Sequence, residues 1–203
     1  MKQHLQDLTE IRSMMERSSR FISLSGLSGI SAGIFALIGA YVAYQRILED
    51  ASGEYLNLLS NTPLLRFIVI DGIIVLTLSL IFAFYFTARQ ARKKGLKLWD
   101  NTSKRLFVNL AVPLVAGGFF CLILLQQAPH LIDCATLVFY GLALVNGSKY
   151  TLDDIRYLGY IEITLGLACG LLNEWRIGLV FWAIGFGVLH IVYGIVMYKK
   201  YEA

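Results

Sequence analysis

Three ionisable side chains, Asp71, Glu162 and His190, lie deep inside apolar stretches of the sequence and are the residues best placed to do chemistry. A charge in hydrocarbon is costly, so an ionisable residue there indicates a functional role. With a helical rise of about 1.5 Å per residue, each lies about 10 Å or more from the nearer end of its stretch. A carboxylate and an imidazole at that depth are groups from which a proton relay can be built.

Glu162 and His190 are predicted to meet. They lie about 10 and 12 Å from the same end of two consecutive stretches, which a short turn joins. Two interpretations are open: a proton relay, and a buried hydrogen-bonded pair that fixes the register of two helices. Asp71 lies too deep for its short side chain to reach water, so we expect it to face the interior of a bundle. Whether the three residues form one polar site stays open at this point.

Arg66 and Asp133 form a second candidate pair, nearer to the ends of their stretches. Each lies about three residues from the end that we predict to be outside, and therefore at about the same depth. We interpret them as an interfacial ion pair, with simple snorkelling of the two side chains as the alternative.

Gly26-Leu27-Ser28-Gly29 resembles the Gly-x-Ser-Gly motif of rhomboid intramembrane proteases, six-span proteins with a catalytic histidine in a late helix. The resemblance implies a serine hydrolase in which His190 activates Ser28 and Glu162 orients the base. The chain departs from that family because its serine lies in the first stretch rather than the fourth, and the His/Asn oxyanion elements have no counterpart. We therefore interpret the motif as helix packing and predict no catalytic residues and no enzymatic activity.

Six long apolar stretches must position these residues. The chain is 57% hydrophobic and 16% charged, whereas a soluble domain has about 25% charged residues. About 20 apolar residues cross a bilayer as a helix, so we predict an all-α, polytopic integral membrane helix bundle in a single domain, 21–198. The predicted spans are 21–44, 64–87, 106–127, 131–147, 155–172 and 177–198. A tight turn at 128–130 should make the third and fourth spans antiparallel neighbours.

The first span is rich in small residues at four-residue spacing, including Ser25, Gly29 and Gly33. Such rows let helix backbones approach closely in lipid, where helices have little hydrophobic drive to associate. We expect the other helices to pack against this one.

Basic residues are sorted by side. If the N-terminus is inside, only Arg46, Arg66 and Arg176 of the 18 Lys and Arg residues fall on the outer side. The positive-inside rule therefore predicts that both termini are cytoplasmic. The largest basic group lies in a cytoplasmic loop and can bind anionic lipid headgroups. The residues that we assign to this contact are Arg89, Arg92, Lys93, Lys94 and Lys97.

The ends of the chain are predicted to be cytoplasmic segments. Apolar residues recur at helical spacing in 1–20, which indicates an amphipathic helix on the membrane or against a partner. A solvated extension of the first span is the alternative. Residues 199–203 form a short tail.

The three cysteines, Cys121, Cys134 and Cys169, all lie within apolar stretches. Buried thiols there behave as small apolar groups, so we predict no disulfide and no metal site. No phosphate-binding loop, zinc motif or dinucleotide fingerprint is found, and we expect no cofactor.

Two blocks, ERSSRFISLSGLSG (16–29) and GFGVLHIVYG (185–194), resemble segments of small bacterial six-span inner-membrane proteins with no assigned activity. The resemblance implies a multi-pass protein of the bacterial cytoplasmic membrane. We predict an accessory, regulatory or interaction protein, with a proton-linked transporter or permease using Asp71, Glu162 and His190 as the alternative. The expected partners are the bilayer and anionic headgroups at the cytoplasmic face, with a homodimer or a protein partner left open and no nucleic acid.

Overall fold

The computed structural model of the chain describes residues 24–49, 62–96, 98–172 and 175–202. Every regular element within these ranges is a helix, and six helices are long and apolar enough to cross a membrane. The prediction of an all-helical protein with six such helices is confirmed. The amphipathic segment predicted at 1–20 and the basic residue Lys97 lie outside the described residues.

Six helical units follow one another, and the last consists of three consecutive segments. They are α2 (Gly26–Glu49), α3 (Thr62–Lys93), α4 (Asn101–Gln127), α5 (Ile132–Gly147), α6 (Asp154–Leu172), and the run of α7 (Trp175–Trp182), η4 (Ala183–Leu189) and α8 (His190–Tyr201). The segment η4 is a π-helix. Single 3₁₀ turns, η2 (Pro129–Leu131) and η3 (Ser148–Tyr150), flank α5. The predicted tight turn is present, and α4 and α5 are neighbours.

Capping residues extend α3 and α4 beyond their predicted spans. α3 continues to Lys93, and Gly95 then takes φ 64°, the left-handed conformation that commonly closes a helix. α4 begins after Asp100, whose side chain accepts hydrogen bonds from the backbone N–H and the hydroxyl of Ser103, each at 2.7 Å. The apolar stretches thus predict where the spans lie, but the caps decide where the helices end.

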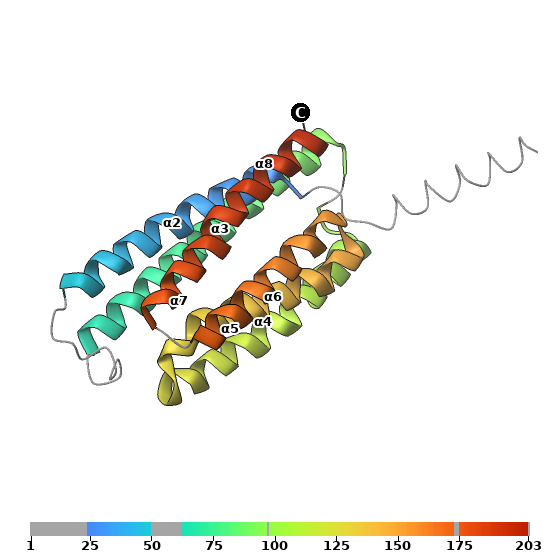
Figure 1. The fold of residues 1–203 in the computed structure, drawn as a ribbon. Helices are drawn as coiled ribbons and strands as arrows, with labels where there is room; N and C mark the ends of the chain where they lie inside the picture. The colour runs from blue at the N-terminus through green and yellow to red at the C-terminus, as the bar shows by residue number, and fades with distance from the viewer. Residues whose placement is uncertain (1–23, 50–61, 97, 173–174, 203) are drawn as a thin grey trace, which may run out of the picture.

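The helices form two groups (Figure 1). In one group α3 packs on α2, and α2 packs on α8 and η4; in the other α4 packs on α5, and α5 packs on α6. α7 and η4 contact helices of both groups. Apolar side chains of α5, α6, α8 and the turn before α6 form a cluster between the groups: Leu144, Leu152, Ile155, Leu158 and Met197.

Glycines bring α2 against the last helical unit. The expectation that the other helices pack against the first span holds for α3 and the last unit, whereas α4, α5 and α6 pack mainly on one another. A Cβ atom added at Gly29 would lie 3.2 Å from the carbonyl oxygen of His190, and one at Gly33 would lie 2.6 Å from that of Gly187. The two backbones are therefore in contact. Ser25 has another role, because it precedes α2 and its hydroxyl donates to the Glu202 carboxylate at 3.1 Å.

The outer faces of α3 and α4 carry large exposed apolar side chains. Phe84 on α3 is 69% exposed, and Phe119 on α4 is 67% exposed. Continuous apolar surface of this kind is found where a protein meets lipid or a partner. It supports the prediction that the bundle lies in a bilayer.

A disulfide joins Cys134 of α5 to Cys169 of α6, with an S–S distance of 2.15 Å and a Cα–Cα distance of 5.5 Å. The prediction of no disulfide is therefore wrong. Apolar surroundings indicate that a cysteine is buried, but they do not show whether a second cysteine faces it. The antiparallel packing of α5 and α6 places these two side chains opposite each other, within the range that a disulfide requires.

The two ends of the bundle differ in chemistry. We call one the basic end: it contains the start of α2 (24–26), the segments 93–96 and 98–100 between α3 and α4, and the end of α8 (199–202). We call the other the disulfide end: it contains the start of α5 and the end of α6, next to Cys134 and Cys169.

Candidate functional site

The structure brings Glu162 and His190 together and adds a third residue, Tyr140. Oε1 of Glu162 lies 3.6 Å from Nδ1 of His190, and the Tyr140 hydroxyl lies 2.8 Å from Nε2 of His190. The three residues belong to α6, α8 and α5, so this polar cluster lies where the two groups of helices meet. The Glu162 side chain is fully buried, and that of His190 is 8% exposed.

The hydrogen-bond partners of His190 fix its ring proton. Nδ1 lies 2.9 Å from the carbonyl oxygen of Gly185, which can only accept, so Nδ1 carries the hydrogen. In the neutral ring Nε2 is then the acceptor, and Tyr140 donates its hydroxyl hydrogen to it. Glu162 thus faces an N–H group that is already bonded to a backbone oxygen.

The Glu162 carboxyl group has no hydrogen-bond donor among the described residues. An ionised carboxylate buried without donors is costly, so the site favours the neutral acid or a charge-balanced pair with protonated His190. The geometry does not favour direct proton transfer from Glu162 to Nδ1 of His190, because Nδ1 already carries a hydrogen. The geometry therefore favours a proton held on the Glu162–His190 pair over transfer of that proton between the two residues.

The π-helical segment η4 closes the cluster. A Cβ atom added at Gly185 would lie 2.6 Å from Oε2 of Glu162 and 2.4 Å from Leu137, so the site requires glycine there. π-Helical turns often occur at functional sites, and this one places the Gly185 carbonyl oxygen beside Nδ1 of His190. Phe186 stacks on the His190 ring at a centroid distance of 5.8 Å. Aromatic and apolar groups thus seal the polar atoms.

Asp71 faces α2 instead. A Cβ atom added at Gly39 would lie 3.3 Å from Oδ2 of Asp71, which is half-buried. No hydrogen bond or ion pair within the described residues connects Asp71 to Glu162 or His190. Because α2 separates α3 from α8, the three predicted residues do not assemble into one site.

Arg66 and Asp133 are not brought together either. Arg66 is exposed on α3, whereas Asp133 on α5 packs against α7, where its Oδ2 would lie 2.9 Å from a Cβ atom added at Gly178. Within the described part of the chain, no ion pair joins them. Equal depth was the basis of the prediction, but α3 and α5 belong to different groups of helices.

Ser28 does not contact the His190 ring. Its hydroxyl donates to the carbonyl oxygen of Ser25 at 2.5 Å, and both ring nitrogens of His190 have other partners. The serine–histidine hydrogen bond of a hydrolase is therefore not formed in the described residues. Ser28 is buried in the first turn of α2.

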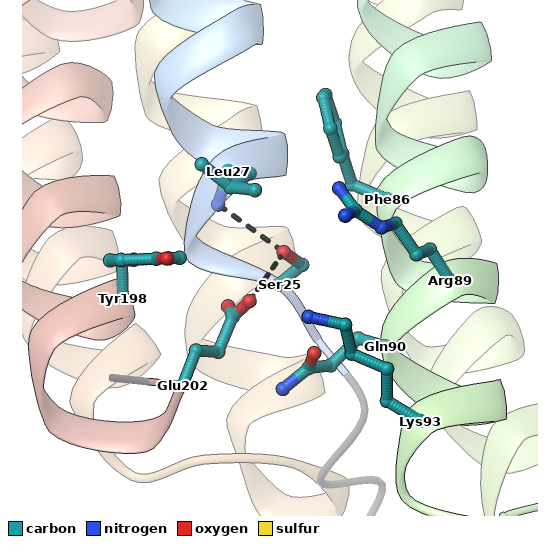
Figure 2. A pocket seen from close by; sticks show the side chains of 8 residues that line it. All are labelled: Ser25, Leu27, Phe86, Arg89, Gln90, Lys93, Tyr198 and Glu202. Carbon is teal, nitrogen blue, oxygen red and sulfur yellow. Dashed lines mark hydrogen bonds between the residues drawn. The ribbon is translucent and has the colours of Figure 1, made fainter.

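A polar pocket opens at the basic end, between the start of α2, the end of α3 and the end of α8 (Figure 2). Its cavity volume is about 70 Å³, room for several water molecules. Glu202 accepts hydrogen bonds from the Gly26 backbone N–H at 2.5 Å and from the Ser25 hydroxyl. The other polar side chains of the lining are Arg89, Gln90, Lys93 and Tyr198. Apart from the basic character of Arg89 and Lys93, no feature of the sequence predicted that these residues line one pocket.

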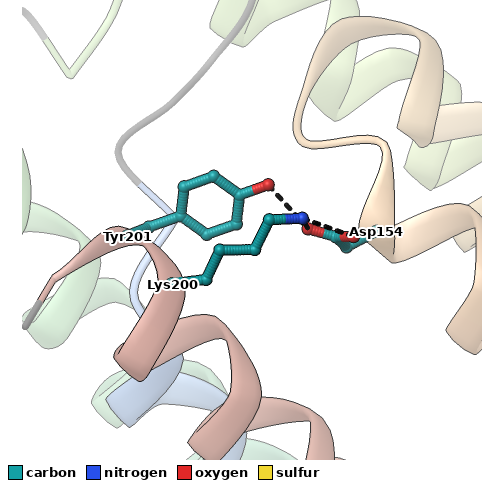
Figure 3. A network of polar contacts seen from close by, with 3 residues as sticks. All are labelled: Asp154, Lys200 and Tyr201. Carbon is teal, nitrogen blue, oxygen red and sulfur yellow. Dashed lines mark hydrogen bonds and ion pairs between the residues drawn. The ribbon is translucent and has the colours of Figure 1, made fainter.

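A second polar contact at the basic end ties α8 to α6 (Figure 3). Nζ of Lys200 lies 2.7 Å from Oδ2 of Asp154, and the Tyr201 hydroxyl donates to the same oxygen at 2.6 Å. Asp154 is in the first turn of α6, where a negative charge is favourable. This network holds the end of the last helix in place beside the pocket.

The remaining predicted headgroup contacts, Arg92 and Lys94, are exposed at the end of α3. No group of three or more His, Cys, Asp or Glu side chains in the described ranges could hold a metal ion. Comparisons of the chain with protein-family models, with curated proteins and with solved structures found no match.

Proposed function

We propose that the chain is a non-enzymatic protein of the bacterial cytoplasmic membrane, accessory or regulatory in role, that engages its partners through the basic end. One contrast supports the proposal. The polar cluster around His190 is sealed and both ring nitrogens are bonded, whereas Arg89 and Lys93 at the basic end have no hydrogen-bond or ion-pair partner within the described residues. The groups open to other molecules thus lie at the end that the positive-inside rule assigns to the cytoplasm.

Site-specific photo-crosslinking in intact cells tests this proposal. Trp99, which is 65% exposed in the segment between α3 and α4, is replaced by a photoreactive phenylalanine derivative. We expect a crosslinked protein of one defined mass, whose yield falls when Arg92 and Lys94 are changed to glutamine.

The matched control carries the same derivative at Phe119, which is 67% exposed on the apolar face of α4. A lipid-facing position should give no protein adduct of that mass. If positions 99 and 119 give the same adducts, or if neither gives one, the proposal fails.

A second candidate function, proton-linked transport, is favoured by one observation: the fully buried Glu162 carboxyl group lies beside His190 and has no donor. Intramembrane acids of this kind carry protons in many pumps and transporters. In proteoliposomes with a pH-sensitive dye inside, such a protein would acidify the lumen when substrate is added. Glu162→Gln should abolish that signal, and Glu49→Gln, at an exposed position, should keep it. No flux with the unmodified chain, or equal flux in Glu162→Gln, rejects this candidate.

A further inference from the structure

The side chains that line the pocket at the basic end carry a net positive charge. Arg89 and Lys93 line it, and Glu202 is the acidic side chain of the lining. Glu202 is engaged elsewhere, because its two oxygens accept from the Gly26 N–H and the Ser25 hydroxyl. No salt bridge within the described residues involves either cation. The ionised lining groups therefore leave an excess of one positive charge facing the pocket.

Gln90 provides an independent indication of a ligand. It is only 7% exposed and lines the pocket, yet its side-chain amide has no hydrogen-bond partner in the described chain. Its amide atoms are not among the fully buried side-chain atoms that have no partner, so they reach the cavity and are free to bond a group that enters it. Figure 2 shows the Gln90 amide and the Lys93 amine extending from α3 towards the start of α2 and Glu202. Three polar side chains near the end of α3, Arg89, Gln90 and Lys93, thus line one cavity.

We infer that this pocket binds a phosphate group, with Arg89 and Lys93 pairing its charge and the Gln90 amide donating a third hydrogen bond. Charge-assisted hydrogen bonds to phosphate are among the strongest that a protein makes. The small cavity suits a single phosphate rather than a large ligand. The inference rests on the proposed function in one respect: both take the basic end to be where the chain binds other molecules.

Two sources can supply that phosphate: the headgroup of an anionic phospholipid, or a free phosphate ion. The cations lie at the end of a membrane-length helix, at the level where headgroups are found. Both sources share the chemistry of the site, and the experiment separates them.

The test uses the full chain in nanodiscs of phosphatidylcholine. In one arm, phosphatidic acid replaces part of the phosphatidylcholine, and native mass spectrometry counts the anionic lipids that stay bound. In the other arm, inorganic phosphate is titrated and the shift in the thermal unfolding midpoint is followed. Binding in the lipid arm alone assigns the site to headgroups, and saturable binding of phosphate assigns it to the free ion. Binding in neither arm overturns the inference.

The variants locate the site. Arg89→Gln and Lys93→Gln should each weaken binding on the order of tenfold, as expected for loss of a charge-assisted hydrogen bond. Glu202→Gln should tighten binding severalfold, because it removes the negative charge from the lining. Arg105→Gln is the matched control, since Arg105 carries the same charge at an exposed position near the start of α4 but does not line the pocket.

Equal losses in Arg89→Gln and Arg105→Gln would show that only general surface charge matters and would overturn the inference of a phosphate site in this pocket. An unchanged thermal midpoint of each variant without ligand verifies that it folds. The crosslinking experiment at Trp99 is independent, because a protein adduct can form there whether or not the pocket holds phosphate. Failure of the pocket and failure of the proposed function are thus distinguishable.

Discussion

Glu162 and His190 lie face to face, 3.6 Å apart from Oε1 to Nδ1, but share no hydrogen bond. Nδ1 of His190 donates its hydrogen to the Gly185 carbonyl oxygen, and Nε2 accepts a hydrogen bond from the Tyr140 hydroxyl. The hydrogen bond between Tyr140 and His190 therefore joins α5 to α8, whereas Glu162 of α6 adds a buried contact without a hydrogen bond. Of the interpretation as a buried hydrogen-bonded pair, the contact is present and the hydrogen bond between Glu162 and His190 is not formed in the described residues.

The first prediction concerns the Tyr140 hydroxyl, the donor to Nε2 of His190. Tyr140→Phe should lower the free energy of unfolding by about 1–3 kcal/mol, because it leaves a buried ring nitrogen without a partner. Thermal or denaturant unfolding in detergent measures the change. Tyr157→Phe is the control, since Tyr157 is 63% exposed on α6. Equal effects of the two substitutions would contradict the role assigned to Tyr140.

The contact of Glu162 with His190 was predictable because the rise of a helix is fixed and a short turn joins their spans. Depth alone was insufficient for Arg66 and Asp133, because two residues at one level meet only if their helices are neighbours. The same limit applies to Asp71, which faces α2 from the other side. Which helices are neighbours depends on tertiary packing, and single spans do not encode it.

The residues that complete the cluster gave weak signals in the sequence. Tyr140 looks like any tyrosine of an apolar stretch until His190 is placed beside it. Gly185, in the π-helical segment, packs closely against Glu162 and Leu137, a contact that appears only once the helices are in place. The paired glycines Gly185 and Gly187 are the sequence feature that could have indicated the close approach of a backbone there.

The second prediction concerns Asp100, the cap of α4. Hydrogen bonds from the backbone N–H and the hydroxyl of Ser103 hold the pKa of this carboxyl below its ordinary value. A group whose pKa is lower in the folded chain stabilises the fold above its unfolded pKa, about 3.9 for Asp, and loses that contribution as the pH falls through the folded value. Asp100→Ala should therefore cost about 1 kcal/mol at pH near 7, the usual value of such a cap.

The pH dependence of stability distinguishes the loss of this cap from other effects of acid on the fold. At pH below the folded pKa of Asp100, the difference in unfolding midpoint between the unmodified chain and Asp100→Ala should shrink. Asp100→Asn keeps an acceptor that does not titrate, so its stability relative to Asp100→Ala should not depend on pH. A difference between the unmodified chain and Asp100→Ala that is the same at neutral and acidic pH would refute the assignment.

The third prediction concerns the disulfide between Cys134 and Cys169. In the denatured, unreduced protein, a maleimide polymer should modify only Cys121, the free cysteine. After reduction it should modify all 3 cysteines. The double change of Cys134 and Cys169 to serine should cost about 2–4 kcal/mol, whereas Cys121→Ser should cost less. Modification of all three without reductant would show that the bond does not form. Disulfides persist in oxidising compartments, which agrees with the proposal that the opposite, basic end faces the cytoplasm.

The fourth prediction tests the close packing of α5 and α6 with two matched glycine substitutions. A Cβ atom at Gly141 would lie 2.6 Å from the Gly159 carbonyl oxygen, whereas one at Gly118 on α4 would meet nothing within 4 Å. Gly141→Ala should lower the free energy of unfolding by about 1–3 kcal/mol, because the helices must separate to admit the methyl group.

Gly118→Ala makes the same chemical change in an open helical position, so it should raise stability by about 0.5–1 kcal/mol through helix propensity alone. Unfolding midpoints of both variants in the same detergent give the comparison. If both substitutions stabilise the chain, α5 and α6 lie farther apart than the structure places them. The disulfide and the polar cluster, which depend on that spacing, would then need another explanation.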